Sequence, residues 1–143
     1  MSAVTSLPCV LHPHARGSVT LRSADPADPP RIELAMAADD RDVDTLMEAC
    51  RRIREIYRAS PIREHVVREV LPGPAVESDD DWRTHIRRAS FGGAHPVGTC
   101  AMGVGEDAVV DPELRVRGVD GLRVVDASVM PTLTSGKIGR AHV

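Results

Sequence analysis

The sequence predicts an α+β fold in which an antiparallel sheet packs with helices. Two short segments with alternating side chains, residues 17–22 and 31–34, flank a proline-rich connector and are typical of paired strands. Apolar residues then recur at helical spacing over residues 39–58. The 143 residues suffice for one domain with a fair core, since a chain of this size buries roughly two-thirds of its unfolded surface.

Composition and charge exclude several classes of protein. Apolar residues make up 42% of the chain and aromatic residues only 2%, so the core has to consist of aliphatic side chains, alanine and methionine. The 18 basic and 21 acidic residues are interleaved, and the net charge of −3 gives no indication of nucleic-acid binding. No apolar run approaches the length of a membrane span. Membrane association and oligomeric state are left open.

The cysteines indicate a reducing compartment. Three of them lie far apart in the sequence, without a Cys-x-x-Cys pair. This pattern argues against a disulfide framework and against a zinc site. We therefore expect a cytoplasmic location and no bound metal.

The first two elements are expected to form a hairpin. The sequence GSVTLR over residues 17–22 and RIEL over residues 31–34 alternate small or apolar side chains with polar ones. The connector SADPADPP between them is rich in turn-forming residues. The two strands should therefore pair antiparallel.

A long amphipathic helix is expected next, capped by Asp39 or Asp40 and ending near Arg58. One face of this helix carries the apolar residues at three- and four-residue steps. The opposite face is predicted to be solvated. The apolar positions are Val43, Leu46, Met47, Cys50, Ile53 and Tyr57, and the solvated ones are Arg51, Arg52, Arg54 and Glu55.

Two further helices are predicted. The pair Ser60-Pro61 places a proline at the first helical position of a helix that runs to about Val70. The third helix begins after Ser78, which forms an S-x-x-D capping pattern with Asp81, and it ends near residue 89.

Beyond residue 104 the sequence predicts short strands, with turns at residues 111–112 and 118–121. Leu114 and Val116 alternate with charged residues, so one face should be buried. The segment LRVV over residues 122–125 is expected to be buried on both sides.

The segment AHPVGTCAMG over residues 94–103 is the strongest candidate for chemistry. Pro96 disfavours helical geometry at His95, and glycines lie on both sides of it, so the histidine should sit on a bent segment that can approach a ligand closely. Imidazole, with an ordinary pKa near 6.5, suits a general base at neutral pH. The alternative is a histidine that only hydrogen-bonds within its own loop.

Residues 95–136 resemble a known family. The run HPVGTCAMG, followed by VVDPELRVRGVDGLRVVDASVMPTLTSG, resembles the C-terminal part of the glucose-methanol-choline (GMC) oxidoreductases, with the choline-dehydrogenase-like branch nearest. A looser resemblance begins near Pro13, where HARGSVTLRSADPADPPRI is similar to the start of the family's substrate domain. These are flavin enzymes that oxidise alcohols.

The resemblance implies an organisation as part of a longer chain. Residues 1–104 would be a substrate-domain segment, and residues 105–136 would be strands that return toward an FAD domain absent from this sequence. No G-x-G-x-x-G is present to hold a dinucleotide. The ending KIGRAHV, residues 137–143, departs from the family's pattern and is interpreted as an artefactual tail.

The resemblance also implies the site. His95 would be the catalytic base, accepting the hydroxyl proton of a small alcohol while hydride passes to FAD. Asp126, Ala127 and Val97 would contact the cofactor. Local sequence alone favours another interpretation of Asp126, a turn that ends a strand. The family's second active-site residue would fall at Gly139, which has no side chain to orient a substrate oxygen.

Two other functions stay open. One is a non-catalytic module that stands alone and binds a separate flavin chain. The other is a metal-binding protein that uses His12, His14 and His95. In either interpretation, and in that of a piece of a larger enzyme, we expect the chain by itself not to be an active dehydrogenase.

Overall fold

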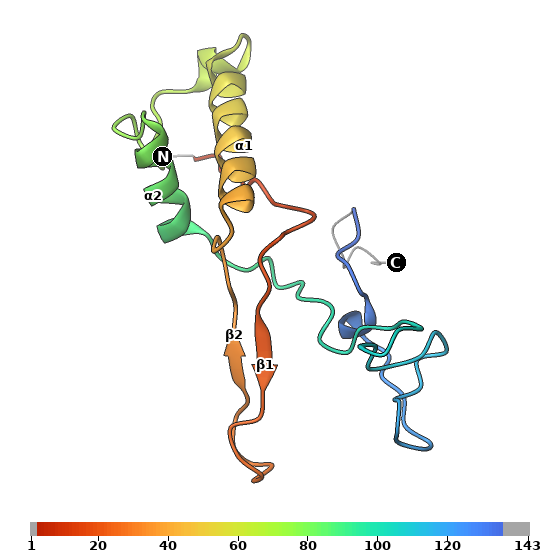
Figure 1. Cartoon of the computed structure of the whole chain (residues 1–143). Helices are drawn as coiled ribbons and strands as arrows, with labels where there is room; N and C mark the ends of the chain where they lie inside the picture. Colours follow the sequence, from red (N-terminus) through yellow and green to blue (C-terminus); the bar gives the residue numbers. More distant parts are fainter. Residues whose placement is uncertain (1–2, 136–143) are drawn as a thin grey trace. The chain divides into compact units, whose positions relative to one another are not determined.

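The computed structural model describes residues 3–135, and their fold class is α+β, as predicted. Helices α1 and α2, the strands β1 and β2 and two short 3-10 turns, η1 and η2, are the regular elements of the described chain (Figure 1). Contacts divide it into two units. The first contains residues 3–15 and 35–91, and the second contains residues 16–34 and 92–135. The predicted division after residue 104 concerns a longer protein and stays a prediction.

Helix α1 (Asp40–Arg58) begins where the sequence predicts. The N-cap is Asp39, whose carboxylate accepts a hydrogen bond from the backbone N–H of Arg41. This bond satisfies one of the donors that the first turn leaves without an intrahelical partner. The predicted apolar face is confirmed at Val43 and Met47, which are buried.

Helix α2 (Asp79–Ala89) has the predicted capping box. The Oγ of Ser78 accepts the backbone N–H of Asp81 at 3.2 Å, and the Asp81 carboxylate accepts the backbone N–H of Ser78 at 3.0 Å. Trp82 and Ile86 are buried against α1. Four side chains, two from each helix, therefore form the buried centre of the first unit, with Leu46, Cys50 and Val76 packed against it.

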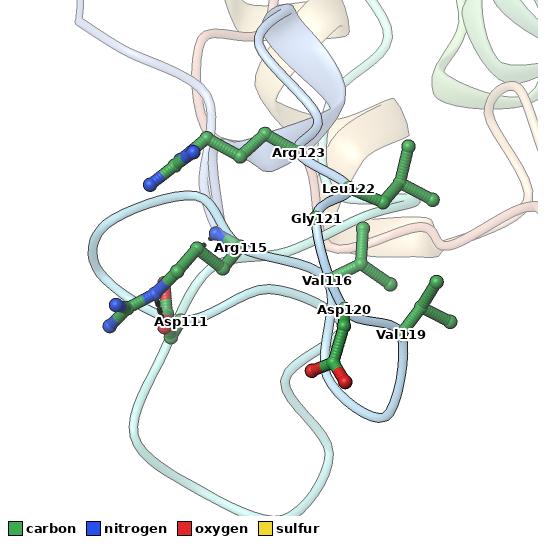
Figure 2. Close-up of a pocket in the computed structure, with 8 residues that line it drawn as sticks. All are labelled: Asp111, Arg115, Val116, Val119, Asp120, Gly121, Leu122 and Arg123. Carbon is green, nitrogen blue, oxygen red and sulfur yellow. Dashed lines mark hydrogen bonds and ion pairs between the residues drawn. The ribbon is translucent and has the colours of Figure 1, made fainter.

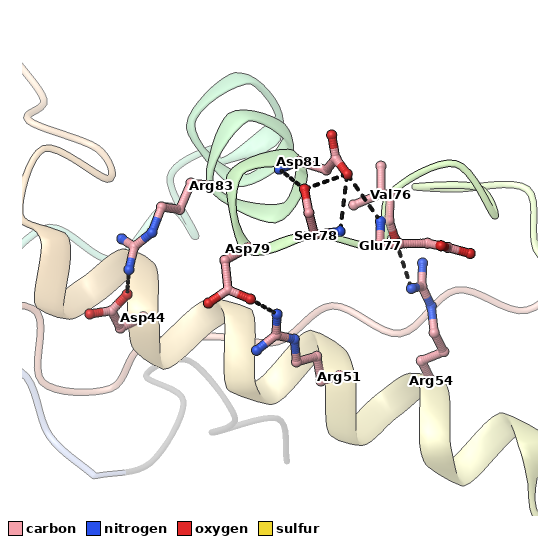
Figure 3. Close-up of polar contacts among 9 residues, drawn as sticks. All are labelled: Asp44, Arg51, Arg54, Val76, Glu77, Ser78, Asp79, Asp81 and Arg83. Atoms are coloured by element: carbon pink, nitrogen blue, oxygen red, sulfur yellow. Dashed lines mark hydrogen bonds and ion pairs between the residues drawn. The ribbon is translucent and has the colours of Figure 1, made fainter.

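Ion pairs on the surface link the same two helices (Figure 3). Arg51 on α1 reaches Asp79 on α2, and Arg83 on α2 reaches Asp44 on α1. Exposed pairs of this kind contribute about 0–1 kcal/mol each. They are consistent with the relative register of the helices, while the apolar centre supplies most of the stability.

Arg54 corrects the prediction that one face of α1 is solvated. Its side chain is only 14% exposed and forms an ion pair with Glu69 at 2.7 Å. Its guanidinium also donates to the backbone carbonyl of Val76 at 2.8 Å and lies 4.5 Å from the centre of the Trp82 ring. The loop before α2 thus covers this part of α1. A guanidinium tolerates such a position because it can stack on an aromatic ring and pair in one plane.

The helix predicted from Ser60 to Val70 is wrong over most of its length. Only η1 (Ile62–His65) is helical, and the backbone is extended at Val66. Two consecutive β-branched residues, Val66 and Val67, weaken the helical preference. The segment also buries no apolar face, since Val67 is 89% exposed. Without burial, a short helix has little to stabilise it.

The predicted hairpin is confirmed. Strand β1 (Ser18–Thr20) pairs antiparallel with β2 (Arg31–Glu33), and Val19 lies opposite Ile32. Gly17 permits a close approach just before β1, because a Cβ at this position would lie 2.0 Å from the carbonyl oxygen of Glu33. Both strands are exposed within the chain.

The segment after residue 104 forms turns joined by single β-bridges rather than regular strands. Val110 bridges to both Met102 and Val116, and Arg115 bridges to Arg123. Val110 is fully buried. The turn at Asp111 is confirmed, because its carboxylate accepts the backbone N–H groups of Glu113 and Arg115.

The prediction that residues 122–125 are buried on both sides is wrong for this chain. Leu122 is 50% exposed and Val125 is 74% exposed. Their apolar character predicts burial only where another layer covers them, and residues 3–135 supply no such layer.

None of the helices within residues 3–135 combines the length and the apolar character that crossing a membrane requires. The predicted cytoplasmic location stays a prediction. Over the same residues, no three histidine, cysteine or acidic side chains come together as metal ligands. The metal-binding alternative stays a hypothesis.

Candidate functional site

His95 lies on the predicted bent segment. The backbone of Ala94, just before it, has a left-handed φ of 59°, and that of Gly98, just after, has a φ of 90°. A left-handed conformation is uncommon for alanine, so the chain turns sharply here. His95 itself is half-buried and belongs to no helix or strand.

The histidine segment is hydrogen-bonded to the other predicted site segment. The backbone N–H groups of Gly98 and Cys100 both donate to the carbonyl oxygen of Ser128, at 3.1 and 3.0 Å. Two residues further on, Met102 donates to the carbonyl oxygen of Val129 at 2.9 Å. The structure therefore brings the run that contains His95 and Val97 alongside the run that contains Asp126 and Ala127.

Asp126 ends the preceding extended segment in a turn. Its carboxylate accepts the backbone N–H of Ser128 at 2.8 Å, and the 3-10 turn η2 (Ala127–Val129) follows. This is the turn that local sequence favours. Hydrogen bonding from the Ser128 side chain, and then from its backbone N–H, holds the pKa of the Asp126 carboxyl below its ordinary value. The carboxylate is therefore ionised at neutral pH.

Two valines next to these two segments are buried. They are Val129, which lies in η2, and Val110, which lies in the loop that follows the histidine segment. Gly103 donates to the carbonyl oxygen of Val110, and Val109 donates to that of Ala101. The histidine segment is thus held by backbone bonds on two sides, from residues 128–129 and from residues 109–110.

A separate depression of about 330 Å³ lies among the turns of the C-terminal segment (Figure 2). The ion pair between Arg115 and Asp111, at 2.7 Å, forms part of its wall. The backbone N–H of Arg115 is the main reason why the pKa of Asp111 is lowered. The predicted site residues are not among those that line it. The residues that line the depression are Asp111, Arg115, Val116, Val119, Asp120, Gly121, Leu122 and Arg123. We do not assign the depression to the site.

The sequence analysis missed Ser128. The spacing Asp-x-Ser could have indicated the hydrogen bond from its N–H to Asp126, because Asp commonly binds the backbone two residues on. The role of its carbonyl as acceptor for two distant N–H groups has no sequence signal. The predicted second active-site position, Gly139, and the suspected tail lie outside the described residues.

Comparison with known proteins decides the family. The profile of the family described as GMC oxidoreductase matches residues 13–139. This chain belongs to the GMC oxidoreductase family. The resemblance seen in the sequence is thereby confirmed over most of the chain.

Individual GMC oxidoreductases are similar over the same region. An alcohol dehydrogenase [acceptor] of Pseudomonas putida is 44% identical over 128 residues, which are 90% of this chain and 23% of that protein. An oxygen-dependent choline dehydrogenase of Brucella ovis is 41% identical over 126 residues, 87% of this chain and 23% of that protein.

The fold is shared with solved GMC oxidoreductases. The crystal structure of pyridoxine 4-oxidase from Mesorbium loti matches with a TM-score of 0.82 and 38% identity, over 90% of this chain and 25% of that one. The chain therefore spans about a quarter of the length of the relatives that it matches.

Proposed function

We propose that this chain forms the C-terminal part of an FAD-dependent oxidoreductase that acts on the CH–OH group of small alcohols. His95 is the general base of the reaction. The observation that supports this proposal is the bonding of the His95 segment to residues 128 and 129, which brings the two predicted parts of the site together.

In the proposed reaction, one ring nitrogen of His95 accepts the hydroxyl proton of the alcohol. The carbon bearing that hydroxyl becomes a carbonyl carbon as it loses hydride. FAD, when bound, supplies the acceptor for the hydride. Proton transfer by a positioned side chain contributes about 10²–10⁴-fold to the rate. The bend at Ala94 and the backbone bonds of Gly98 and Cys100 would fix the position of the imidazole.

The residues at the site fit FAD through their backbone rather than through their charges. The carboxylate of Asp126 is already engaged by Ser128, and as an anion it does not suit the anionic pyrophosphate of the cofactor. Backbone N–H groups suit flavin and phosphate oxygens well. Val97, Asp126 and Ala127 would therefore contact FAD through their main chain.

The test is a chimera in which residues 13–135 replace the matching quarter of the Pseudomonas putida alcohol dehydrogenase. Its FAD-loaded form is mixed with alcohols anaerobically, and flavin reduction is followed by absorbance. We expect His95→Ala to slow reduction by about 10²–10⁴-fold, with the FAD content unchanged. His65→Ala, at an exposed histidine of η1, is the matched control. An undiminished rate in His95→Ala would rule out the proposed role.

The alternative of a non-catalytic module that binds a separate flavin chain has one observation in its favour. Apolar side chains at Leu122 and Val125 are exposed and could meet another chain. Under this alternative the chimera would bind FAD and give equal rates with histidine or alanine at position 95.

A further inference from the structure

The carbonyl oxygen of Ser128 is the point at which the two segments of the site meet. It accepts hydrogen bonds from Gly98 and from Cys100, at 3.1 and 3.0 Å. A carbonyl oxygen has two lone pairs, so one oxygen can accept both bonds. This single carbonyl therefore binds the residues on the C-terminal side of His95 at two points.

Gly98 is suited to this contact. Its φ of 90° lies in the region that favours glycine. The glycine thus allows the histidine segment to turn directly against η2.

Asp126 in turn binds both peptide units that flank Ser128. Its Oδ1 accepts the backbone N–H of Ser128 at 2.8 Å, and its own carbonyl accepts the N–H of Val129 at 3.2 Å. Val129 is buried and accepts the N–H of Met102. The peptide units of η2 are therefore held from within the turn and from the histidine segment.

We propose that Asp126 is a positioning residue for His95: its carboxylate holds η2 so that the Ser128 carbonyl binds Gly98 and Cys100 and thereby fixes the histidine segment. This inference rests on the proposed function of His95. In this inference the side chain of Asp126 acts on the position of His95, whereas the family resemblance implied that Asp126 contacts the cofactor.

Substitutions at Asp126 separate the two roles. Asparagine keeps an oxygen that can accept the Ser128 N–H but carries no charge, while alanine has no acceptor. If the carboxylate acts through the turn, asparagine should preserve function and alanine should not. If the charge acts on the cofactor or on solvent, both substitutions should have the same effect.

The experiment uses the FAD-loaded chimera defined above. We expect Asp126→Ala to slow flavin reduction by about 10- to 100-fold, since small displacements of catalytic groups have effects of this size. Asp126→Asn should remain within about threefold of the parent, as expected where the hydrogen bond is kept. FAD content should not change. Asp25→Ala, which removes a similar turn bond to the N–H of Ala27 in the hairpin, is the matched control.

A double substitution tests whether Asp126 acts through His95. Residues that act as one unit are not additive in their effects on rate. In the His95→Ala background, Asp126→Ala should therefore cause no further loss. An equal further loss in that background would overturn the inference, as would equal loss with asparagine and alanine or a fall in FAD content.

Hydrogen exchange supplies a readout besides activity. In Asp126→Ala the amides of residues 97–103 should exchange faster than in the parent, and in Asp126→Asn they should exchange at the parent rate. Unchanged exchange in Asp126→Ala would overturn the inference. If the alanine variant does not fold, Asp126→Ser supplies a weaker acceptor and should exchange faster than asparagine. Parent-like exchange in the serine variant would then overturn it.

The two proposals fail separately. If His95→Ala leaves the rate unchanged, the proposed function is wrong. If His95→Ala slows reduction but the Asp126 variants behave otherwise than described, only the positioning role is wrong.

Discussion

Removing the buried carboxylate of Asp42 should destabilise the first unit strongly. Asp42 lies in the first turn of α1 and is only 4% exposed. Its two oxygens accept the backbone N–H of His14, at 2.8 and 3.1 Å, and one of them accepts the N–H of Ala15 at 2.9 Å. One side chain thus ties the N-terminal segment to α1.

The magnitude follows from these contacts. Asp42→Ala removes the shared acceptor of two backbone N–H groups. Each donor deprived of its acceptor costs about 1–3 kcal/mol when buried. Because the contacts are part-buried, we take the lower half of that range and expect a loss of about 2–4 kcal/mol. Asp42→Asn keeps one acceptor oxygen and should lose about half as much.

Trp82 provides the assay. It is the single tryptophan of the chain and is buried in the same apolar centre as Val43, the neighbour of Asp42. Urea unfolding followed by its fluorescence should show a midpoint lowered by roughly 1–2 M for Asp42→Ala, given a slope of about 2 kcal/mol per molar.

Asp44→Ala on the same helix is the control. Asp44 is an exposed carboxylate paired with Arg83, so its removal should cost no more than about 1 kcal/mol. If Asp42→Ala and Asp44→Ala lower the midpoint equally, the Asp42 carboxylate does not hold the N-terminal segment against α1, and the reasoning is refuted.

Two further predictions concern the start of α2. Ser78→Ala removes the acceptor of the Asp81 N–H and should lower stability by about 1 kcal/mol in the same urea assay, whereas the exposed Thr84→Ala within the helix should not. A hydrogen bond from the Ser78 side chain, and then those from backbone N–H groups, hold the pKa of Asp81 below its ordinary 3.8. Its stabilising contribution is therefore present above pH 3.8 and is lost as the pH falls through the lower pKa of the folded state. As the pH is lowered from about 5 to about 2, a range that spans a carboxyl titration, the urea midpoint of Asp81→Asn should fall less than that of the parent. An equal fall of the midpoint in both proteins would contradict this.

The elements predicted correctly are those whose signals are local. Ser78 with Asp81, and Asp39 before α1, are side chains that bond to backbone a few residues away. The hairpin likewise follows from alternation on either side of a turn. In each case the residues that determine the structure lie within one short window of the sequence.

The errors occur where distant residues decide the outcome. Arg54 is covered because Glu69 and Trp82 meet it from other parts of the chain. Residues 66–70 fail to form a helix because their apolar side chains are left exposed by the rest of residues 3–135. At the site, the sequence indicates His95. The hydrogen bonds that hold its segment are accepted by the backbone carbonyl of Ser128, and a backbone acceptor cannot be recognised from the type of residue that carries it.

The hairpin has a consequence for how substitutions in this family are scored. Val19 lies opposite Ile32, so their side chains share one face, and Leu21 and Leu34 follow on the same side by alternation. Ser18, Thr20, Arg31 and Glu33 occupy the other face. Within this chain the four apolar side chains are 50–88% exposed, so a mutational scan of the chain by itself would rate polar replacements there as harmless. In any larger assembly that covers this face, the same replacements would bury polar groups and rank among the most damaging. Tolerance at these four positions is therefore a measure of what surrounds the hairpin.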